Sequence, residues 1–345
     1  MKQKTTILVL IILFFSACKK EPVIQIYKPD FEVFVLLPVE GLGDRSFVDI
    51  TYEGVETAFI DFKFRVNYIV PKNLDEAKSW INALADLERT DGLNTLVIIA
   101  GNQYENSLKA LNGHFGSHKI LFINGSFDEN EGLASVTYQT FAPSYIGGYL
   151  SAQLKPNCRA MVIAGFDAPF YKDFDQGFKQ GVIDAGGSIH ESAYISNDFS
   201  GFAMADSAYR LTEQLLSEND LIFALACGSN MGIINAARNY SEQRYVIGLD
   251  SDQSWMGLNV VTGSVISLIG DDIYNYIEAF SHGTFESGDF IRTMEDGATT
   301  FLINEIVMGD AGIPENLIQR SIQKEKEYLL NRDSFSKSSN FYNKK

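Results

Sequence analysis

The sequence has few cysteines and comparatively few positive charges. Three cysteines in a chain of 345 residues cannot form a disulfide framework, which excludes the small disulfide-stabilised folds. Lysine and arginine number 28 against 44 aspartates and glutamates, which gives a net charge of −16. Because binding to a phosphate backbone requires clustered positive charge, we expect no nucleic-acid partner. The 46% of hydrophobic residues exclude a disordered chain, and the length suffices for about two domains.

Motifs for catalysis, cofactors and metals are also scarce. No Gly-x-Ser-x-Gly nucleophile elbow and no Gly-Lys-Ser/Thr phosphate loop occurs. The segment 41–46 (GLGDRS) is similar to a dinucleotide fingerprint, but Ser46 replaces the third glycine and Asp44 would repel a pyrophosphate. We interpret Asp44 or Ser46 as a helix cap. His114 and His118 have the spacing of a zinc pair, but glycines around them disfavour the required helix. We therefore predict no enzyme activity, no metal and no cofactor.

The N-terminus has the pattern of an export signal. After a short basic start, the apolar run Ile7–Phe15 is shorter than the ~20 residues that span a bilayer. Two small residues and Cys18 follow, which is typical of a bacterial lipoprotein cleavage site. We predict a signal peptide over residues 1–17 and a tether over 18–30, with Cys18 carrying the lipid (palmitate) that holds the exported protein at a cell membrane. The alternative is an ordinary signal peptide with an incidental cysteine.

From residue 31 on, short apolar runs alternate with longer amphipathic stretches. Near-continuous Val/Ile/Leu/Phe strands separated by helices predict an α/β fold with parallel sheets covered on both faces. We expect strands at 31–37, 64–70, 95–100, 119–124, 133–138, 159–165, 220–227, 244–250 and 299–304. We expect helices near 46–60, 73–90, 104–113, 143–154, 171–186, 201–217, 229–240, 267–282 and 314–330. The segments that follow strands 31–37 and 159–165 have a weak internal sequence similarity. This similarity favours two similar lobes whose strand ends face one cleft.

Two carboxylates follow a strong strand in the segment 248–253 (GLDSDQ). Asp250 and Asp252 could hold a metal, act as acid and base, or accept hydrogen bonds from the vicinal hydroxyls of a sugar. A polar strand-to-loop junction is the simpler alternative. Cys158 and Cys227 lie at strand ends and could pair or remain two buried thiols.

Five motifs in order resemble the basic membrane protein family (PnrA-like). These are substrate-binding lipoproteins of ABC importers, and characterised members bind purine nucleosides. The motifs lie at 43–54, 134–150, 174–178, 230–234 and 247–253, so the resemblance covers roughly residues 31–305. It implies a type I periplasmic-binding-protein fold of two Rossmann-like lobes with the ligand cleft between them. The chain would cross between lobes near 141, 252 and 284. Lobe 1 would comprise 31–141 plus about 253–284, lobe 2 would comprise 142–252 plus about 285–330, and 331–345 would form a flexible tail.

The resemblance also implies a set of ligand contacts. Asp44 would hold the base, and Asp250 would accept the ribose hydroxyls. Phe47 and Phe223 would be aromatic contacts, although Phe223 could equally be a core strand residue. Gly228 would be a backbone contact.

Three positions depart from the family pattern. Val48 stands where asparagine is usual, Asn124 where aspartate is usual, and Ser267 where lysine is expected. Asn124 can still contact a base because its amide both donates and accepts. We predict a monomeric substrate-binding lipoprotein that captures a nucleoside by hinge closure and docks on an ABC permease. The alternatives are an exported enzyme using Asp250 and Asp252, and a sensory or adhesive surface lipoprotein.

Overall fold

The computed structural model describes residues 28–88, 91–116, 118–127 and 131–342. The predicted signal peptide (1–17) and the first ten residues of the predicted tether, Cys18 among them, lie outside this part of the chain. The strands are β1 Phe31–Leu36, β2 Phe64–Ile69, β3 Asn94–Ala100, β4 Lys119–Ile123, β5 Leu133–Tyr138, β6 Arg159–Ala164, β7 Ser188–Ile189, β8 Ala193–Tyr194, β9 Leu221–Leu225, β10 Tyr245–Asp250, β11 Val261–Ser267, β12 Gly288–Arg292 and β13 Thr299–Ile303. The α-helices are α1 Phe47–Asp61, α2 Leu74–Ala85, α3 Glu105–Lys109, α4 Phe141–Ala152, α5 Lys172–Asp184, α6 Ala205–Leu215, α7 Asn230–Asn239, α8 Ile269–Ser281, α9 Glu305–Met308 and α10 Glu315–Tyr342.

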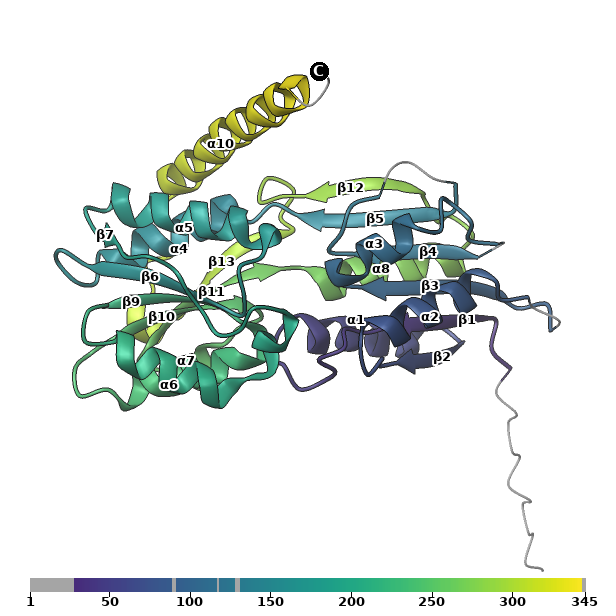
Figure 1. Ribbon diagram of the computed structural model, residues 1–345, viewed down its shortest axis with the longest axis horizontal. Coiled ribbons are helices and arrows are strands. Elements are labelled where there is room, and N and C mark those ends of the chain that lie inside the picture. Colours follow the sequence, from purple (N-terminus) through teal and green to yellow (C-terminus); the bar gives the residue numbers. More distant parts are fainter. Residues whose placement is uncertain (1–27, 89–90, 117, 128–130, 343–345) are drawn as a thin grey trace, which may run out of the picture.

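These elements form two lobes, each built on one sheet (Figure 1). The first sheet has the strand order β12-β5-β4-β3-β1-β2 and is parallel throughout. The second has the order β13-β11-β10-β9-β6-β7, with β8 also against β6, and only β13 runs antiparallel to its neighbour. Helices cover both faces of each sheet, so the predicted α/β fold with parallel sheets is confirmed.

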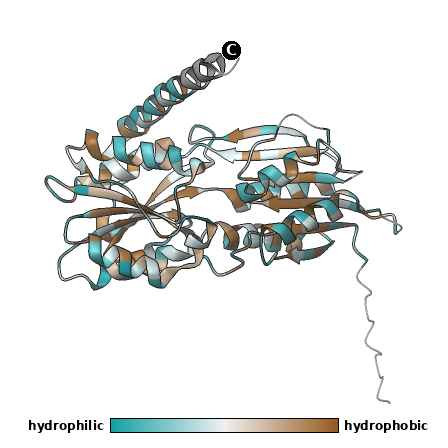
Figure 2. Ribbon diagram, viewed as in Figure 1, coloured by the Kyte–Doolittle hydropathy of each residue, from teal (hydrophilic) through white to brown (hydrophobic). Residues whose placement is uncertain are grey.

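The strand interiors are hydrophobic because both of their faces are buried. Every residue of β9 is buried, and its side chains alternate between two cores. Leu221, Phe223 and Leu225 pack toward α4 and α5, while Ile222 and Ala224 pack toward α6 and α7. Figure 2 shows the same pattern, with hydrophobic strands inside and hydrophilic residues on the outer faces of the helices.

The chain crosses between the lobes three times, and two of these crossings lie at residues other than those predicted. The first crossing lies between β5 and α4, close to residue 141. Strand β11 pairs with β10 and therefore belongs to lobe 2, so the chain returns to lobe 1 near 268 instead of 252. Strand β12 pairs with β5 and belongs to lobe 1, so the last crossing lies near 293 instead of 284. Neither strand was predicted, since β11 is rich in serine and glycine and β12 is a half-exposed edge strand.

The C-terminal segment differs from the prediction as well. Helix α10 continues through Tyr342, so residues 331–342 are helical, whereas the predicted helix ends near 330. Since the segment 315–342 contains no glycine or proline, nothing in the sequence ends the helix at 330. In Figure 1 this helix projects from lobe 2 beyond the body of the protein. Within the described residues, no helix combines the length and apolar character needed to cross a bilayer.

Candidate ligand-binding site

A cavity lies between the lobes at the carboxyl ends of their parallel strands, where α/β proteins commonly bind ligands. Its volume, taken as the space that the centres of water molecules can occupy, is about 90 Å³. By the same measure a single water molecule needs only about 10–15 Å³. Lobe 1 contributes residues that follow or end β1, β3, β4 and β5, and lobe 2 contributes residues that follow or end β6, β9, β10 and β11. A bound molecule would therefore contact both lobes.

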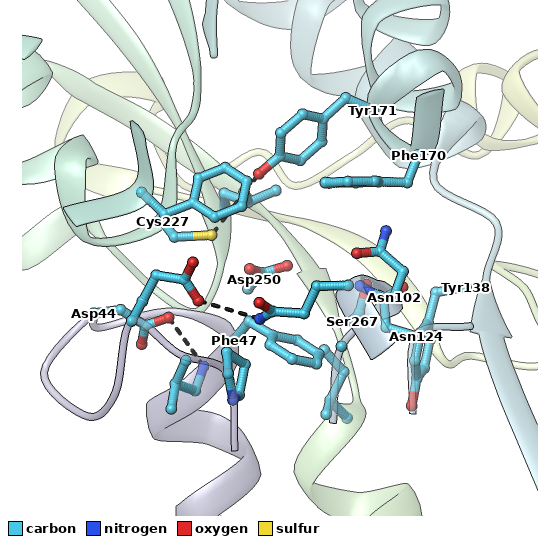
Figure 3. A pocket seen from close by; sticks show the side chains of 18 of the residues that line it. Asp44, Phe47, Asn102, Asn124, Tyr138, Phe170, Tyr171, Cys227, Asp250 and Ser267 are labelled. Atoms are coloured by element: carbon cyan, nitrogen blue, oxygen red, sulfur yellow. Dashed lines mark hydrogen bonds between the residues drawn. The ribbon is translucent and has the colours of Figure 1, made fainter. Parts of the chain in front are cut away.

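Seven aromatic side chains line this cavity. Phe47 and Tyr138 come from lobe 1, and the others, from lobe 2, are Phe170, Tyr171, Phe174, Phe199 and Phe202. The lobe 2 rings pack on one another; the ring centroids of Phe170 and Tyr171, for example, lie 4.6 Å apart. In Figure 3, Phe170 and Tyr171 lie on one side of Asp250 and Phe47 on the other. Such faces suit a planar heterocycle or the apolar face of a sugar.

Asp44 is held in place by the start of helix α1. Its carboxylate accepts hydrogen bonds from the backbone N–H groups of Ser46 (2.9 Å), Val48 (3.0 Å) and Asp49 (3.1 Å). Asp44 therefore caps the helix, which bears out the interpretation of this residue as a cap. Burial raises the pKa of the Asp44 carboxyl, and the three hydrogen bonds counteract this. Asp44 also lines the cavity, and its Oδ2 accepts only one of these bonds.

Asp250 ends β10 and lies at the junction of the lobes. Its side chain is buried, and its Oδ2 accepts a hydrogen bond of 2.6 Å from the Ser46 hydroxyl of lobe 1. Burial raises the pKa of Asp250 from 3.8 to about 7; the bond from Ser46 lowers it and the nearby charge of Asp44 raises it further. A buried carboxylate with unused acceptor positions is suited to a ligand that donates hydrogen bonds.

Strained backbone conformations gather around the cavity. Asn124 (φ 61°), Cys227 (φ 45°) and Asp250 (φ 63°) adopt the left-handed region although none is glycine, and all three line the cavity. Each follows or ends a strand, at β4, β9 and β10. Conformations of this kind cost about 1–3 kcal/mol and are found preferentially at binding sites, where they aim a side chain.

The two lobes contact each other around Asp250, so the lobes are in a closed arrangement. Besides the bond from Ser46, the Arg45 carbonyl accepts hydrogen bonds from Ser251 Oγ (2.7 Å) and Gln253 Nε2 (3.3 Å) of lobe 2. The Arg45 guanidinium also lies 5.0 Å from the centre of the Trp255 ring.

Two of the predicted contacts lie outside the cavity wall. Phe223 is fully buried in the middle of β9 and packs against Phe174 and Phe178, so its assignment to the ligand is wrong and it is a core residue. Gly228 lies where the lobes approach each other. A Cβ at Gly228 would come within 2.9 Å of the Phe202 carbonyl oxygen and 3.3 Å of the Asp44 Cα, so a glycine permits the lobes to meet there.

The other predicted residues lie together. Asp44, Phe47, Asn124 and Asp250 all line the cavity, as do Val48 and Ser267, the other two positions that depart from the family pattern. Cys158 and Cys227 are free thiols, and Cys227 contributes its side chain to the wall. No group of three or more His, Cys, Asp or Glu side chains within the described residues could hold a metal ion.

Sequence reasoning missed all five lobe 2 aromatics of the cavity wall and the polar pair Glu40 and Gln103. The aromatics lie in two short segments, 166–174 and 199–202, whose phenylalanine-rich composition directly after polar turns was the only available signal. Glu40 and Gln103 come from loops that follow β1 and β3, 63 positions apart in sequence, and nothing local connects them.

Comparisons with known proteins agree with this geometry. A family model described as "ABC transporter substrate-binding protein PnrA-like" matches residues 31–329. The chain is 23% identical over 294 residues to basic membrane protein D of Borreliella burgdorferi (84% of this chain, 83% of the relative). It is 27% identical over 286 residues to basic membrane protein B of the same species (77% and 80%).

Solved structures show the same architecture. An ABC transporter solute-binding protein from Aeropyrum pernix K1 superposes with a TM-score of 0.71 at 19% identity, covering 86% of each chain. A solute-binding protein from Burkholderia graminis in complex with D-arabinose has a TM-score of 0.59 at 16% identity (80% of this chain, 96% of the other). These likenesses establish the type I periplasmic-binding-protein fold predicted from the sequence.

Proposed function

The chain belongs to the PnrA-like family of ABC transporter substrate-binding proteins, and we propose that it captures a nucleoside, with a purine base favoured, between its lobes. The family and the fold are those of solute-binding proteins, which are not enzymes. The closed, loaded form would dock on the permease of an ABC importer. Cys18 would hold the protein at the membrane of a bacterial cell through its lipid.

The observation that carries the proposal is the pairing of aromatic walls with a buried carboxylate at the lobe junction. Phe47 on lobe 1 and Phe170 on lobe 2 offer ring faces to a flat base. Asp250 offers carboxylate oxygens to the vicinal hydroxyls of a ribose. Among the described lining residues there is no lysine, arginine or histidine, which supports an uncharged ligand over a nucleotide.

Closure follows from the same contacts. A ligand that touches both lobes binds the closed form better than the open form and shifts the population toward it. Hydroxyl groups that donate to Asp250 would favour its charged form and so offset the burial that raises its pKa. Ligand uptake near pH 6 should therefore release protons.

The test is a calorimetric titration of the purified protein with adenosine, guanosine, uridine, ribose and D-arabinose. We expect a purine nucleoside to bind, and at 100 times its dissociation constant to stabilise the protein by about 2.7 kcal/mol. Asp250→Ala should abolish this binding while the protein stays folded, and Asp252→Ala, which changes an exposed carboxylate two residues away, should not. Binding of a free sugar without any nucleoside would overturn the nucleoside assignment.

Two further steps of the proposal have their own tests. Cys18→Ser should prevent acylation, so the protein should leave the detergent phase in a phase-partition experiment. Cells that lack the protein should lose ATP-dependent nucleoside uptake, and the wild type but not Asp250→Ala should restore it.

A further inference from the structure

Two hydrogen-bond acceptors in the lobe 1 wall of the cavity have no partner. Glu40 Oε1 and Gln103 Oε1 are buried from solvent and accept no hydrogen bond from any described residue, and both side chains line the cavity. An unpaired buried acceptor is costly, and native proteins seldom keep one without a reason. A ligand group that donates hydrogen bonds would satisfy both.

The two side chains form a fixed pair. Gln103 Nε2 donates a hydrogen bond of 3.2 Å to Glu40 Oε2, which orients the Gln103 amide because its oxygen would repel the carboxylate. While Glu40 is charged, the two remaining oxygens, Glu40 Oε1 and Gln103 Oε1, can only accept hydrogen bonds. They lie in the same part of the lobe 1 wall, since they belong to groups joined by one hydrogen bond. An amino group, with two hydrogens on one nitrogen, has a donor for each of them.

The pair lies beside an aromatic wall of the cavity. A Cβ placed on Gly101 would lie 3.6 Å from the Phe47 ring and 3.7 Å from Gln103 Nε2, so Gly101 separates the two side chains without filling the space between them. The φ of Gly101 is 104°, which other residues rarely adopt. A base stacked on Phe47 would present its edge to Gln103 and Glu40.

The electrostatic surroundings favour a donor group as well. Burial raises the pKa of Glu40, hydrogen bonds from its own backbone N–H and from Gln103 counteract this, and the charges of Asp44 in lobe 1 and Asp198 in lobe 2 raise it further. A donor group next to Glu40 would reduce the repulsion between its carboxylate and these charges.

We propose that Glu40 and Gln103 form a subsite for an amino group on the ligand, and that this subsite selects amino-bearing over oxo-bearing bases. The proposal rests on the proposed capture of a nucleoside. It assigns a specificity-determining role to two residues that follow different strands, β1 and β3.

The experiment compares adenosine with inosine, which carries an oxygen where adenosine carries the amino group. We expect the wild type to bind adenosine at least about tenfold tighter than inosine, because inosine would place an acceptor against two acceptors. Glu40→Gln should reduce this ratio below about threefold, since the new amide can turn its N–H₂ toward the inosine oxygen. Gln103→Ala should weaken adenosine more than inosine. Glu105→Gln, which removes the same charge from a side chain outside the cavity wall, should leave the ratio unchanged.

The possible outcomes separate this inference from the proposed function. Equal affinities, or a preference for inosine, would overturn the subsite while leaving nucleoside capture intact; the second result would mean that Glu40 acts as a proton donor. If the wild type binds neither nucleoside, the same comparison is made with glucosamine and glucose. A preference for glucosamine that is lost in Glu40→Gln would uphold the subsite and refute the nucleoside. Binding of none of the four compounds would refute the subsite, and the titration with guanosine and uridine then decides the nucleoside assignment.

Discussion

The buried charge of Asp250 is open to a direct test by Asp250→Asn. This substitution keeps the size of the side chain and keeps an oxygen that can accept the hydrogen bond from Ser46, but it removes the charge. Asp250 as a residue is only 9% exposed, so the charge is poorly solvated in the folded protein. Burial raises the pKa from 3.8 to about 7.

The sign and size of the effect follow from linkage. Between these two pH values the folded protein binds more protons at Asp250 than the unfolded chain does, so stability falls as the pH rises from about 4 to about 7. Each pH unit of that interval lowers the free energy of unfolding by about 1.4 kcal/mol. Above pH 7 the loss of stability therefore reaches about 4 kcal/mol. Asp250→Asn should therefore be more stable than the wild type at pH 8 by up to that amount. The two proteins should be equally stable at pH 4.

The assay is thermal unfolding of the ligand-free proteins at intervals from pH 4 to pH 8. We expect the melting temperature of Asp250→Asn to exceed that of the wild type by several degrees at pH 8, with the difference appearing between pH 4 and 7. Asp252→Asn is the control, because the Asp252 side chain is exposed and the same exchange should change stability by less than about 0.5 kcal/mol. A difference that does not vary with pH, or a less stable Asp250→Asn at pH 8, would refute the reasoning.

Three other substitutions probe the rest of the site. Phe170→Ala should weaken nucleoside binding by about 1–3 kcal/mol in calorimetry with little change in melting temperature, because Phe170 lines the cavity and is only half-buried; unchanged affinity would remove it from the ligand contacts. Asp44→Ala should lower the free energy of unfolding by about 1–3 kcal/mol in urea, since three backbone N–H groups lose their acceptor, and a neutral result would contradict the cap. Trp255→Phe should abolish a ligand-induced change in tryptophan fluorescence that Trp80→Phe retains, because Trp255 contacts Arg45 across the lobes. A signal that follows Trp80 would contradict closure at this contact.

Local patterns were sufficient for much of the fold. All nine predicted strands are present, and the continuous apolar runs among them, such as β9, are stable only when both faces of a sheet are covered. The weak strands β11 and β12 were missed, and with them the true positions of two crossings. Which sheet each of these two strands joins depends on which neighbouring strand has an unpaired edge. A segment of seven residues does not encode that neighbour.

Phe223 illustrates the corresponding limit for the site. Its position in a strand was predicted, but its side chain points to the core shared with Phe178 because it lies in the middle of β9 and not at its end. Most lobe 2 aromatics that line the cavity, such as Phe170 and Phe202, lie in short 3-10 helical turns beyond the strands.

The sequence by itself therefore determined the alternation of strands and helices, the cap at Asp44 and the position of Asp250 at the end of a strand, since each depends on residues close together in the chain. Only the tertiary structure decided that Ser46 meets Asp250 across 204 positions, that seven aromatic side chains line one cavity, and that Glu40 and Gln103 face it as a pair. These features arise when the carboxyl ends of the strands of two sheets are brought together, and the free energy of such contacts is distributed over residues that no local pattern connects.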